Sequence, residues 1–186
     1  MTTDNDYPSP LTLVATIESL LFVADAPVPV SHLAEVLECD ERDVEAALQS
    51  LAESTIGRGV RLQRRDNRVQ LVSAPEAASA IERFLGLSLA GKLSAAALET
   101  LAIIAYQQPI TRPQIEAIRG VSSDGVLRTL LSKGLIEEVG RLETVGHPVL
   151  FGTTFEFLQY FGLSSLSELP PLEIQKIVHP AETEEV

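Results

Sequence analysis

Apolar residues near the start of the chain recur with the period of an α-helix. They fall at i, i+4, i+7, i+8 and i+11, so they share one face of the expected helix. These residues are Leu13, Ile17, Leu20, Leu21 and Ala24. Pro27 and Pro29 are expected to end the helix, because proline lacks the backbone N–H that helical hydrogen bonding needs.

Two shorter helices are expected next, with only a few residues between them. Ser31 can cap the first and Asp40 the second, since short polar side chains accept hydrogen bonds from the first N–H groups of a helix. The inward residues are Leu33, Val36 and Leu37 in the first helix and Val44, Ala47, Leu48 and Leu51 in the second. The short gap around Glu38 and Cys39 is typical of a helix-turn-helix.

A β-hairpin is predicted after these helices. Residues 60–65 and 68–72 read as strands, and Asp66 and Asn67 between them tolerate the positive φ of a two-residue turn. This turn sets Arg65 opposite Arg68 and Leu62 opposite Leu71. The apolar residues, Val60 and Val69 among them, then share one face, which a one-residue slip would not achieve. Three helices followed by such a hairpin predict a winged helix.

A fourth helix and a linker complete the first half of the chain. The helix is expected over residues 75–85, with Pro75 near its start. Its inner side is expected to carry Ala78, Ile81 and Phe84 or Leu85. The linker is expected over residues 86–93.

The same order of elements begins again at Ser94. Helices are expected over residues 94–106, 111–119 and 122–133, where Thr111 and Gln114 have the spacing of a capping box and Gly120 and Gly134 stop helices. Strands over residues 135–142 and 149–152 flank a turn at residues 146–148. Thr153 and Glu156 form a second capping-box pattern, before a closing helix.

The two halves align at a constant offset of 82 positions. The aligned pairs are Pro27 and Pro109, Val28 and Ile110, Leu33 and Ile115, Val36 and Ile118, Val44 and Val126, and Leu48 and Leu130. We therefore predict a mainly α fold of two tandem winged-helix (helix-turn-helix) domains with small β-hairpin wings. The expected boundaries are a flexible N-terminus (1–10), an N-terminal domain (11–88), a C-terminal domain (89–170) and a disordered acidic tail (171–186).

The tail segment also contains a small apolar cluster, which either docks on a partner or reflects residual collapse. Its residues are Leu172, Ile174, Ile177 and Val178.

Composition narrows the class of protein. No stretch reaches the roughly 18 unbroken apolar residues of a membrane-spanning helix, the N-terminus does not resemble an export signal, and the single Cys39 fits a reducing compartment. These features predict a soluble cytoplasmic protein. The chain also lacks a Cys-x-x-Cys, a His-x-x-x-His and a glycine-rich phosphate loop, so we expect no enzyme activity, no cofactor and no metal site.

Charge argues against the whole surface binding nucleic acid. The formal net charge is −12, and the third helix of the first half, where a winged helix usually contacts DNA, is acidic. A winged-helix transcription regulator is the alternative function, but it would need a basic recognition helix. The first hairpin is the basic exception: Arg61, Arg64, Arg65 and Arg68 either contact phosphates or pair with acids of this or another chain.

Several longer motifs carry a resemblance to a known family. They are ETLAIIAYQQPITR (residues 99–112), IEAIRGV (115–121), LIEEVGR (135–141), FGTTFEFL (151–158) and FGL (161–163). Together they resemble the segregation and condensation protein B family, and the similarity covers roughly residues 11–170. One departure is His147, which stands where the family usually has an arginine.

The resemblance implies a non-enzymatic accessory subunit of the bacterial condensin complex, acting in chromosome condensation and segregation. Its partner would be the central segment of an ScpA-like kleisin, which bridges the heads of a structural-maintenance-of-chromosomes (SMC) ATPase. Direct DNA binding is expected to be weak or absent, and contact with the nucleoid to run through the complex. The resemblance also implies a homodimer formed through the first domain, near Leu13, Ile17 and Leu21 or the first wing. The expected kleisin contacts are Tyr106, Arg112, Ile115, Glu116, Arg119 and Arg141.

Overall fold

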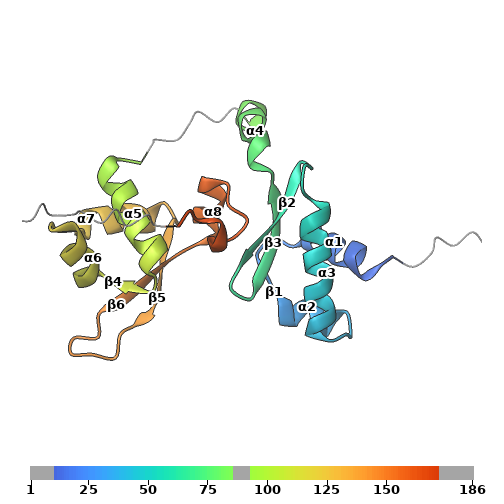
Figure 1. Cartoon of the computed structure of the whole chain (residues 1–186), viewed down its shortest axis with the longest axis horizontal. Coiled ribbons are helices and arrows are strands. Elements are labelled where there is room, and N and C mark those ends of the chain that lie inside the picture. The colour runs from blue at the N-terminus through green and yellow to red at the C-terminus, as the bar shows by residue number, and fades with distance from the viewer. Residues whose placement is uncertain (1–10, 86–92, 172–186) are drawn as a thin grey trace, which may run out of the picture.

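Two successive halves with the same order of helices and strands make up the computed structural model, which describes residues 11–85 and 93–171 (Figure 1). The first half contains α1 (Leu13–Val23), β1 (Val28–Pro29), α2 (Val30–Val36), α3 (Glu41–Ser54), β2 (Val60–Arg65), β3 (Arg68–Ser73), the 3-10 turn η1 (Pro75–Ala77) and α4 (Ala78–Leu85). The second contains α5 (Ala95–Gln107), β4 (Ile110–Thr111), α6 (Arg112–Arg119), α7 (Asp124–Ser132), β5 (Ile136–Arg141), β6 (Val149–Thr153), α8 (Phe155–Phe161) and η2 (Leu166–Glu168).

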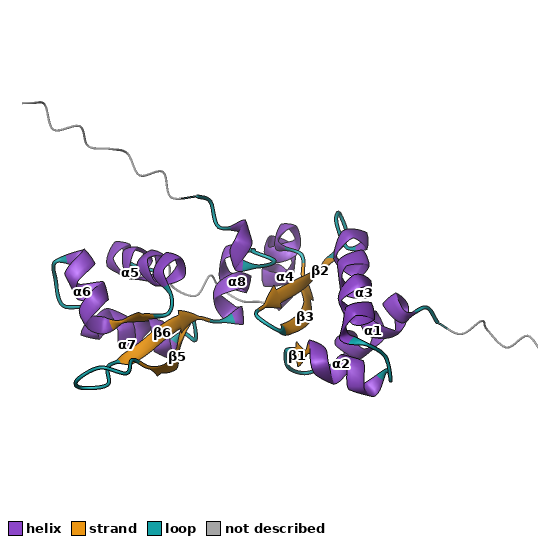
Figure 2. Ribbon diagram, turned by 60° about the horizontal axis from the view of Figure 1, so that its bottom comes forward, coloured by secondary structure: helices purple, strands orange, loops and turns teal. Residues whose placement is uncertain are grey.

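Each half combines helices with one small antiparallel sheet (Figure 2). The strand orders are β1-β3-β2 and β4-β6-β5. The predicted hairpin register is confirmed, since Leu62 pairs with Leu71 and Arg65 with Arg68, and Asp66 has a φ of 53°. The third strands, β1 and β4, were not predicted, because two residues are too few to display a strand pattern.

Two separate clusters of buried side chains support the halves. One runs from Ile17 to Val69 and the other from Leu93 to Leu158. Residues 82 positions apart have matching burial: Leu33 and Ile115 are buried, as are Leu48 and Leu130. The predicted repeat of architecture therefore extends to the packing of the two cores.

Some local expectations about the first half are wrong. Helix α2 already begins at Val30 with Pro29 at its N-cap, so Ser31 lies inside the helix. Val36, expected to point inward, is 52% exposed. Helix α4 forms, but it has no buried residue and Phe84 is 88% exposed, because no element of the first half covers its apolar side. Residues 86–92 of the expected linker lie outside the described residues, whereas Leu93 is buried in the second core.

In the second half the capping box of α6 is confirmed, and the cap of α8 is shifted. Thr111 and Gln114 cap α6 reciprocally, as expected. The N-cap of α8 is Thr154 rather than Thr153, and its side chain accepts a hydrogen bond from the Phe157 N–H. Thr153 ends strand β6, where its backbone N–H donates to Gln108 Oε1 at 2.7 Å. Of the expected tail, residues 172–186 lie outside the described parts of the chain.

Candidate interaction surfaces

Three of the expected site residues meet on helix α6, where it faces α5 and the start of α7. Arg119 donates from Nε and Nη2 to Glu99 Oε2 of α5, both at 3.1 Å, and from Nη1 to Ser123 Oγ at 3.0 Å. The Arg119 side chain is only 5% exposed. Arg119 therefore joins three helical segments and presents almost no surface to a partner.

The Glu116 side chain hydrogen-bonds to the start of α7, whereas the Arg112 side chain points outward. The Glu116 carboxylate accepts a hydrogen bond from the Ser123 backbone N–H at 2.9 Å, which satisfies a donor that the helix itself leaves unpaired. Arg112 pairs with Asp124 at 3.0 Å and with Glu116 at 3.5 Å, yet half of its side chain remains exposed. Of the three residues, Arg112 offers the most accessible charge.

Large apolar side chains are also exposed on and next to α6. Leu98 on α5, Ile118 on α6 and Val121 after α6 are 43%, 57% and 56% exposed. Exposed apolar side chains and arginines are both common in protein–protein contacts. We call Leu98, Arg112, Ile118 and Val121 the α6 surface. The sequence pattern did not single out its apolar members, because Ile118 has the spacing of an inward-facing residue.

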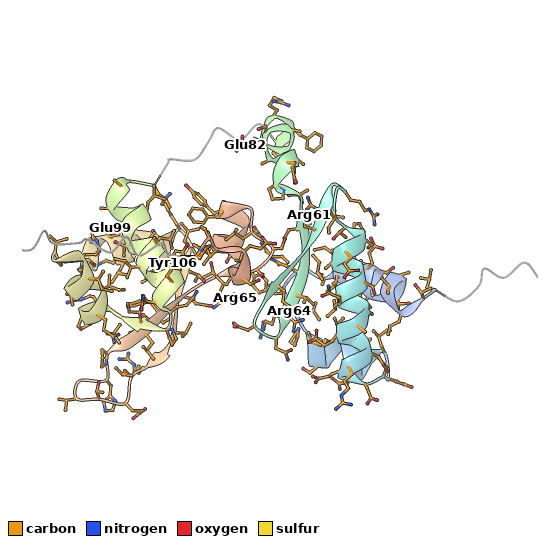
Figure 3. All side chains as sticks on the ribbon, viewed as in Figure 1. Arg61, Arg64, Arg65, Glu82, Glu99 and Tyr106 are labelled. Atoms are coloured by element: carbon orange, nitrogen blue, oxygen red, sulfur yellow. The ribbon has the colours of Figure 1, made fainter. Side chains whose placement is uncertain are left out.

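The remaining expected kleisin contacts are not part of this cluster of side chains. Ile115 is fully buried in the second core and cannot touch another chain. The Tyr106 hydroxyl, near the end of α5 (Figure 3), donates to the Pro170 carbonyl at 2.6 Å. Arg141, at the end of β5, donates to the His147 carbonyl at 3.1 Å. The structure thus brings together Arg112, Glu116 and Arg119, but not these three residues.

Helix α1 has a different exposed face from the one expected. Ile17 and Leu21 are 0% and 3% exposed and belong to the first core, while Leu13 is partly buried against it. Ile17 and Leu21 therefore hold the fold together and are not available to a second chain. Phe22 and Val23 are 82% and 75% exposed, and Leu11 precedes the helix at 67%. We call Phe22 and Val23, the adjacent exposed residues at the end of α1, the α1 surface.

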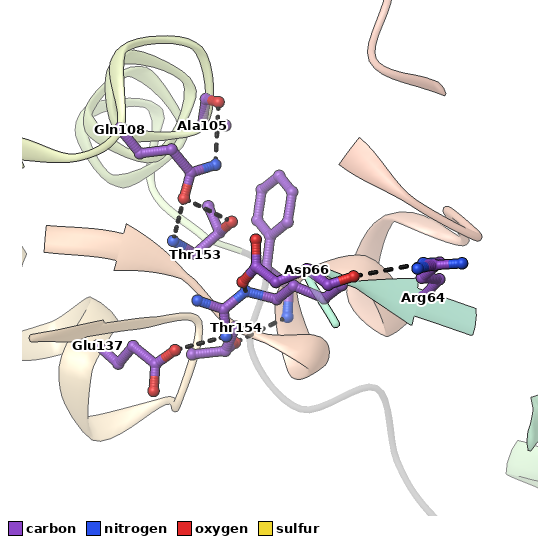
Figure 4. A network of polar contacts seen from close by, with 9 residues as sticks. Arg64, Asp66, Ala105, Gln108, Glu137, Thr153 and Thr154 are labelled. Carbon is purple, nitrogen blue, oxygen red and sulfur yellow. Dashed lines mark hydrogen bonds and ion pairs between the residues drawn. The ribbon is translucent and has the colours of Figure 1, made fainter. Parts of the chain in front are cut away.

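The arginines of the first hairpin are mostly paired with carboxylates of the same chain. Arg61 contacts Glu76 at 2.8 Å, Arg64 contacts Glu45 at 2.5 and 2.7 Å, and Arg65 contacts Glu137 of β5 (Figure 4). The hydrogen bond from Arg64 lowers the pKa of the Glu45 carboxyl below its ordinary value. Arg68 is exposed and has no ion pair within residues 11–85 and 93–171. Of the two interpretations of this hairpin, pairing with acids accounts for three of the four arginines.

Candidate metal ligands do not cluster in the described parts of the chain. No group of three or more His, Cys, Asp or Glu residues there is placed to hold a metal ion. His32 and His147 each lie beside a single glutamate, Glu35 and Glu143. No helix within residues 11–85 and 93–171 is long and apolar enough to cross a membrane.

Comparison with a family model and comparison with individual known proteins identify the same family. Residues 15–172 match the family model described as segregation and condensation complex subunit ScpB. Segregation and condensation protein B of Moorella thermoacetica is 50% identical over 163 residues, which cover 87% of this chain and 83% of that protein. The protein of the same name from Clostridium botulinum is 46% identical over 159 residues, covering 84% and 82%.

Solved structures of related chains are also similar in sequence. ScpB from Mycobacterium tuberculosis is 39% identical, over 83% of this chain and 99% of that chain, with a TM-score of 0.39. A dimer of an ScpB N-terminal domain complexed with an ScpA peptide is 27% identical, over 38% of this chain and 91% of that chain, with a TM-score of 0.36.

Proposed function

The chain belongs to the segregation and condensation protein B family, and we propose that it is a non-enzymatic accessory subunit of an SMC–kleisin condensin complex. In this role it binds the central segment of an ScpA-like kleisin and, through it, the SMC ATPase. Its contribution to chromosome condensation and segregation is then structural, and it acts in the cytoplasm, reaching the nucleoid through the complex. Membership of the family and the exposed apolar side chains on α1 and α6 support this proposal.

The proposed architecture is a pair of tandem winged-helix domains, over residues 11–88 and 89–170. Three helices and a three-stranded antiparallel sheet recur in each half, with the short first strand between the first and second helices, and each half has its own core. This arrangement supports a division in which one domain carries the contact with a second copy and the other carries the contact with the kleisin.

The α6 surface is the proposed kleisin-binding site. The observation that carries this proposal is Ile118, a large apolar side chain left 57% exposed on the helix that also carries the half-exposed Arg112. A partner that covered Ile118 would remove apolar area from water, and Arg112 offers a positive charge to an acidic residue of the same partner. Arg119 and Glu116 act as positioning residues beneath this surface.

The α1 surface is the proposed dimer contact. A described ScpB N-terminal domain forms a dimer with a bound ScpA peptide, and membership of the same family brings this assembly to the present chain as a proposal. Phe22 and Val23 offer adjacent exposed apolar groups of the kind that a symmetric contact buries.

Co-purification with the kleisin encoded in the same genome tests the proposal. We expect Ile118→Asp combined with Arg112→Glu to weaken kleisin binding at least tenfold, because removal of a central apolar anchor costs about 2 kcal/mol. Val36→Asp is the matched control, since Val36 occupies the corresponding position in the first half and is 52% exposed. Undiminished binding by the double variant would exclude the α6 surface. Failure of the unchanged chain to bind any kleisin would exclude the function itself.

A further inference from the structure

The two halves of the chain contact one another through the segment that follows α8. The Gln63 side chain donates from Nε2 to the Leu163 carbonyl at 2.8 Å, and the Arg64 backbone N–H donates to the Ser164 carbonyl at 2.8 Å. Figures 1 and 2 both show α8 beside the β2–β3 hairpin. Residues 100 positions apart in the sequence are thus hydrogen-bonded directly.

Two further contacts flank these hydrogen bonds. Gly162 ends α8 with a φ of 67°, and a Cβ built there would lie 2.9 Å from the Pro75 Cβ. Only glycine therefore allows this close approach without movement of the neighbouring residues. On the other side Arg65 of β2 pairs with Glu137 of β5, and the Arg65 side chain is 14% exposed.

The segment occupies the free edge of a sheet. In the order β1-β3-β2, strand β2 is outermost, and an edge strand presents backbone groups without partners in its own sheet. The Ser164 carbonyl accepts a hydrogen bond from one of these groups, the Arg64 backbone N–H. Residues 163–164 thus cover part of an edge that would otherwise be open to another polypeptide.

The hydrogen bonds and the ion pair of this contact are made by polar groups, while each half keeps its own apolar core. Leu163, which follows Gly162, packs with the second core and not with the first. The hairpin residue that faces the segment is Gln63, which is 1% exposed and also accepts a hydrogen bond from Gln70. A glutamine can hydrogen-bond to protein groups when the halves are in contact and to water when they are apart. An apolar residue at this position would instead favour the buried state. Contacts of this kind between domains permit relative motion.

We propose that Gly162–Ser164 is a reversible latch, which closes the two halves by binding the edge of β2 and the outer face of the hairpin. Gln63 and the Arg65–Glu137 pair hold the latch, and Gly162 provides the space for it. The closed chain presents the α1 and α6 surfaces in one fixed relation, and the open chain lets them move independently. This inference holds whether or not those surfaces bind the proposed partners.

Energy transfer between fluorophores on the full-length chain tests the latch. Cysteines introduced at two exposed positions, Glu41 on α3 and Lys133 after α7, in a Cys39→Ser background, report the separation of the halves. We expect a major closed population and a minor open population for this parent chain. Gln63→Ala should increase the ratio of open to closed molecules about fivefold, the effect of one net hydrogen bond. Arg65→Glu should act in the same direction, because it places two carboxylates together.

Two controls separate opening from misfolding. Arg83→Glu makes the same change of charge in the first half, but Arg83 on α4 is exposed and has no ion pair among the described residues, so it should leave the population closed. Arg65→Glu combined with Glu137→Arg exchanges the two charges and should restore the closed population. The proposal is overturned if Gln63→Ala and Arg65→Glu leave the transfer distribution unchanged, or if the charge exchange fails to restore it while circular dichroism shows both halves folded.

Discussion

Arg119 and Glu99 join two helices of the second half through a pair of hydrogen bonds, from Nε and Nη2 to the same carboxylate oxygen, both 3.1 Å long. The Arg119 side chain is almost completely covered, and its third hydrogen bond reaches Ser123 at the start of α7. Arg112 on the same helix is half exposed. Two arginines seven residues apart therefore have different roles, one in the fold and one at the surface.

Substitution of each arginine by alanine should separate these roles. Arg119→Ala should lower the free energy of unfolding by about 1 to 2 kcal/mol, because charge-assisted hydrogen bonds between α5, α6 and α7 are lost. Arg112→Ala should change it by less than about 0.5 kcal/mol, as is usual for an exposed site. Urea titration followed by circular dichroism measures both values. Equal effects of the two variants would contradict this assignment.

The oligomeric state should depend on the α1 surface. Phe22→Glu places a charge at the centre of the proposed dimer contact, so it should convert the dimer to a monomer, as measured by size-exclusion chromatography with light scattering. Phe84→Glu is the matched control, because Phe84 on α4 is just as exposed, at 88% against 82%. A monomer produced by Phe84→Glu but not by Phe22→Glu would move the dimer contact to α4.

Local patterns in the sequence were sufficient for most helices and for the hairpin register. Alternation on both sides of Asp66-Asn67 allows one pairing that keeps Leu62 and Leu71 together, and this pairing is observed. The short strands β1 and β4 were not predicted. They lie at corresponding positions of the two halves, so the constant offset of 82 positions is a sequence feature that indicates them.

Burial was harder to predict, because periodicity defines an apolar face but not what covers it. Val36 and Ile118 both have core spacing, and both remain exposed, at 52% and 57%. Ile17 and Leu21 were assigned to an interface although the first core already covers them. The partner of Arg119 is Glu99, 20 residues away, and the partner of Arg65 lies 72 residues away in the other half. Such pairs depend on tertiary packing and leave no local signal.

Gly152 in strand β6 should not tolerate a side chain. A Cβ there would lie 2.9 Å from Val139 Cγ1 and 3.1 Å from Gln108 Oε1, the oxygen that accepts hydrogen bonds from Thr153. Gly152→Ala should therefore destabilise the chain by about 1 to 3 kcal/mol in urea titration. Val139→Ala in the same chain should restore part of this loss, because it removes the nearest contact. Gly125→Ala, where a Cβ meets nothing within 4 Å, is the control and should cause no loss.

The last prediction concerns pH and the pair of Glu45 and Arg64, which links α3 to the hairpin. Arg64 donates to both carboxylate oxygens of Glu45, and this hydrogen bonding lowers the pKa of Glu45 in the folded chain. A carboxyl whose pKa is lower in the folded state adds stability above its unfolded pKa, about 4.3, and loses this contribution as the pH falls through its folded pKa. Both side chains are 40% exposed, so solvent screens the pair and the contribution at pH 7 should be about 0.5 kcal/mol.

Glu45→Gln should thus be slightly less stable than the unchanged chain at pH 7, and the difference should shrink below about pH 4. A double-mutant cycle with Arg64→Gln, measured by urea titration at several pH values, isolates the coupling between the two residues. A coupling energy that stayed constant from pH 7 to pH 3 would mean that the charge of Glu45 does not stabilise the hairpin.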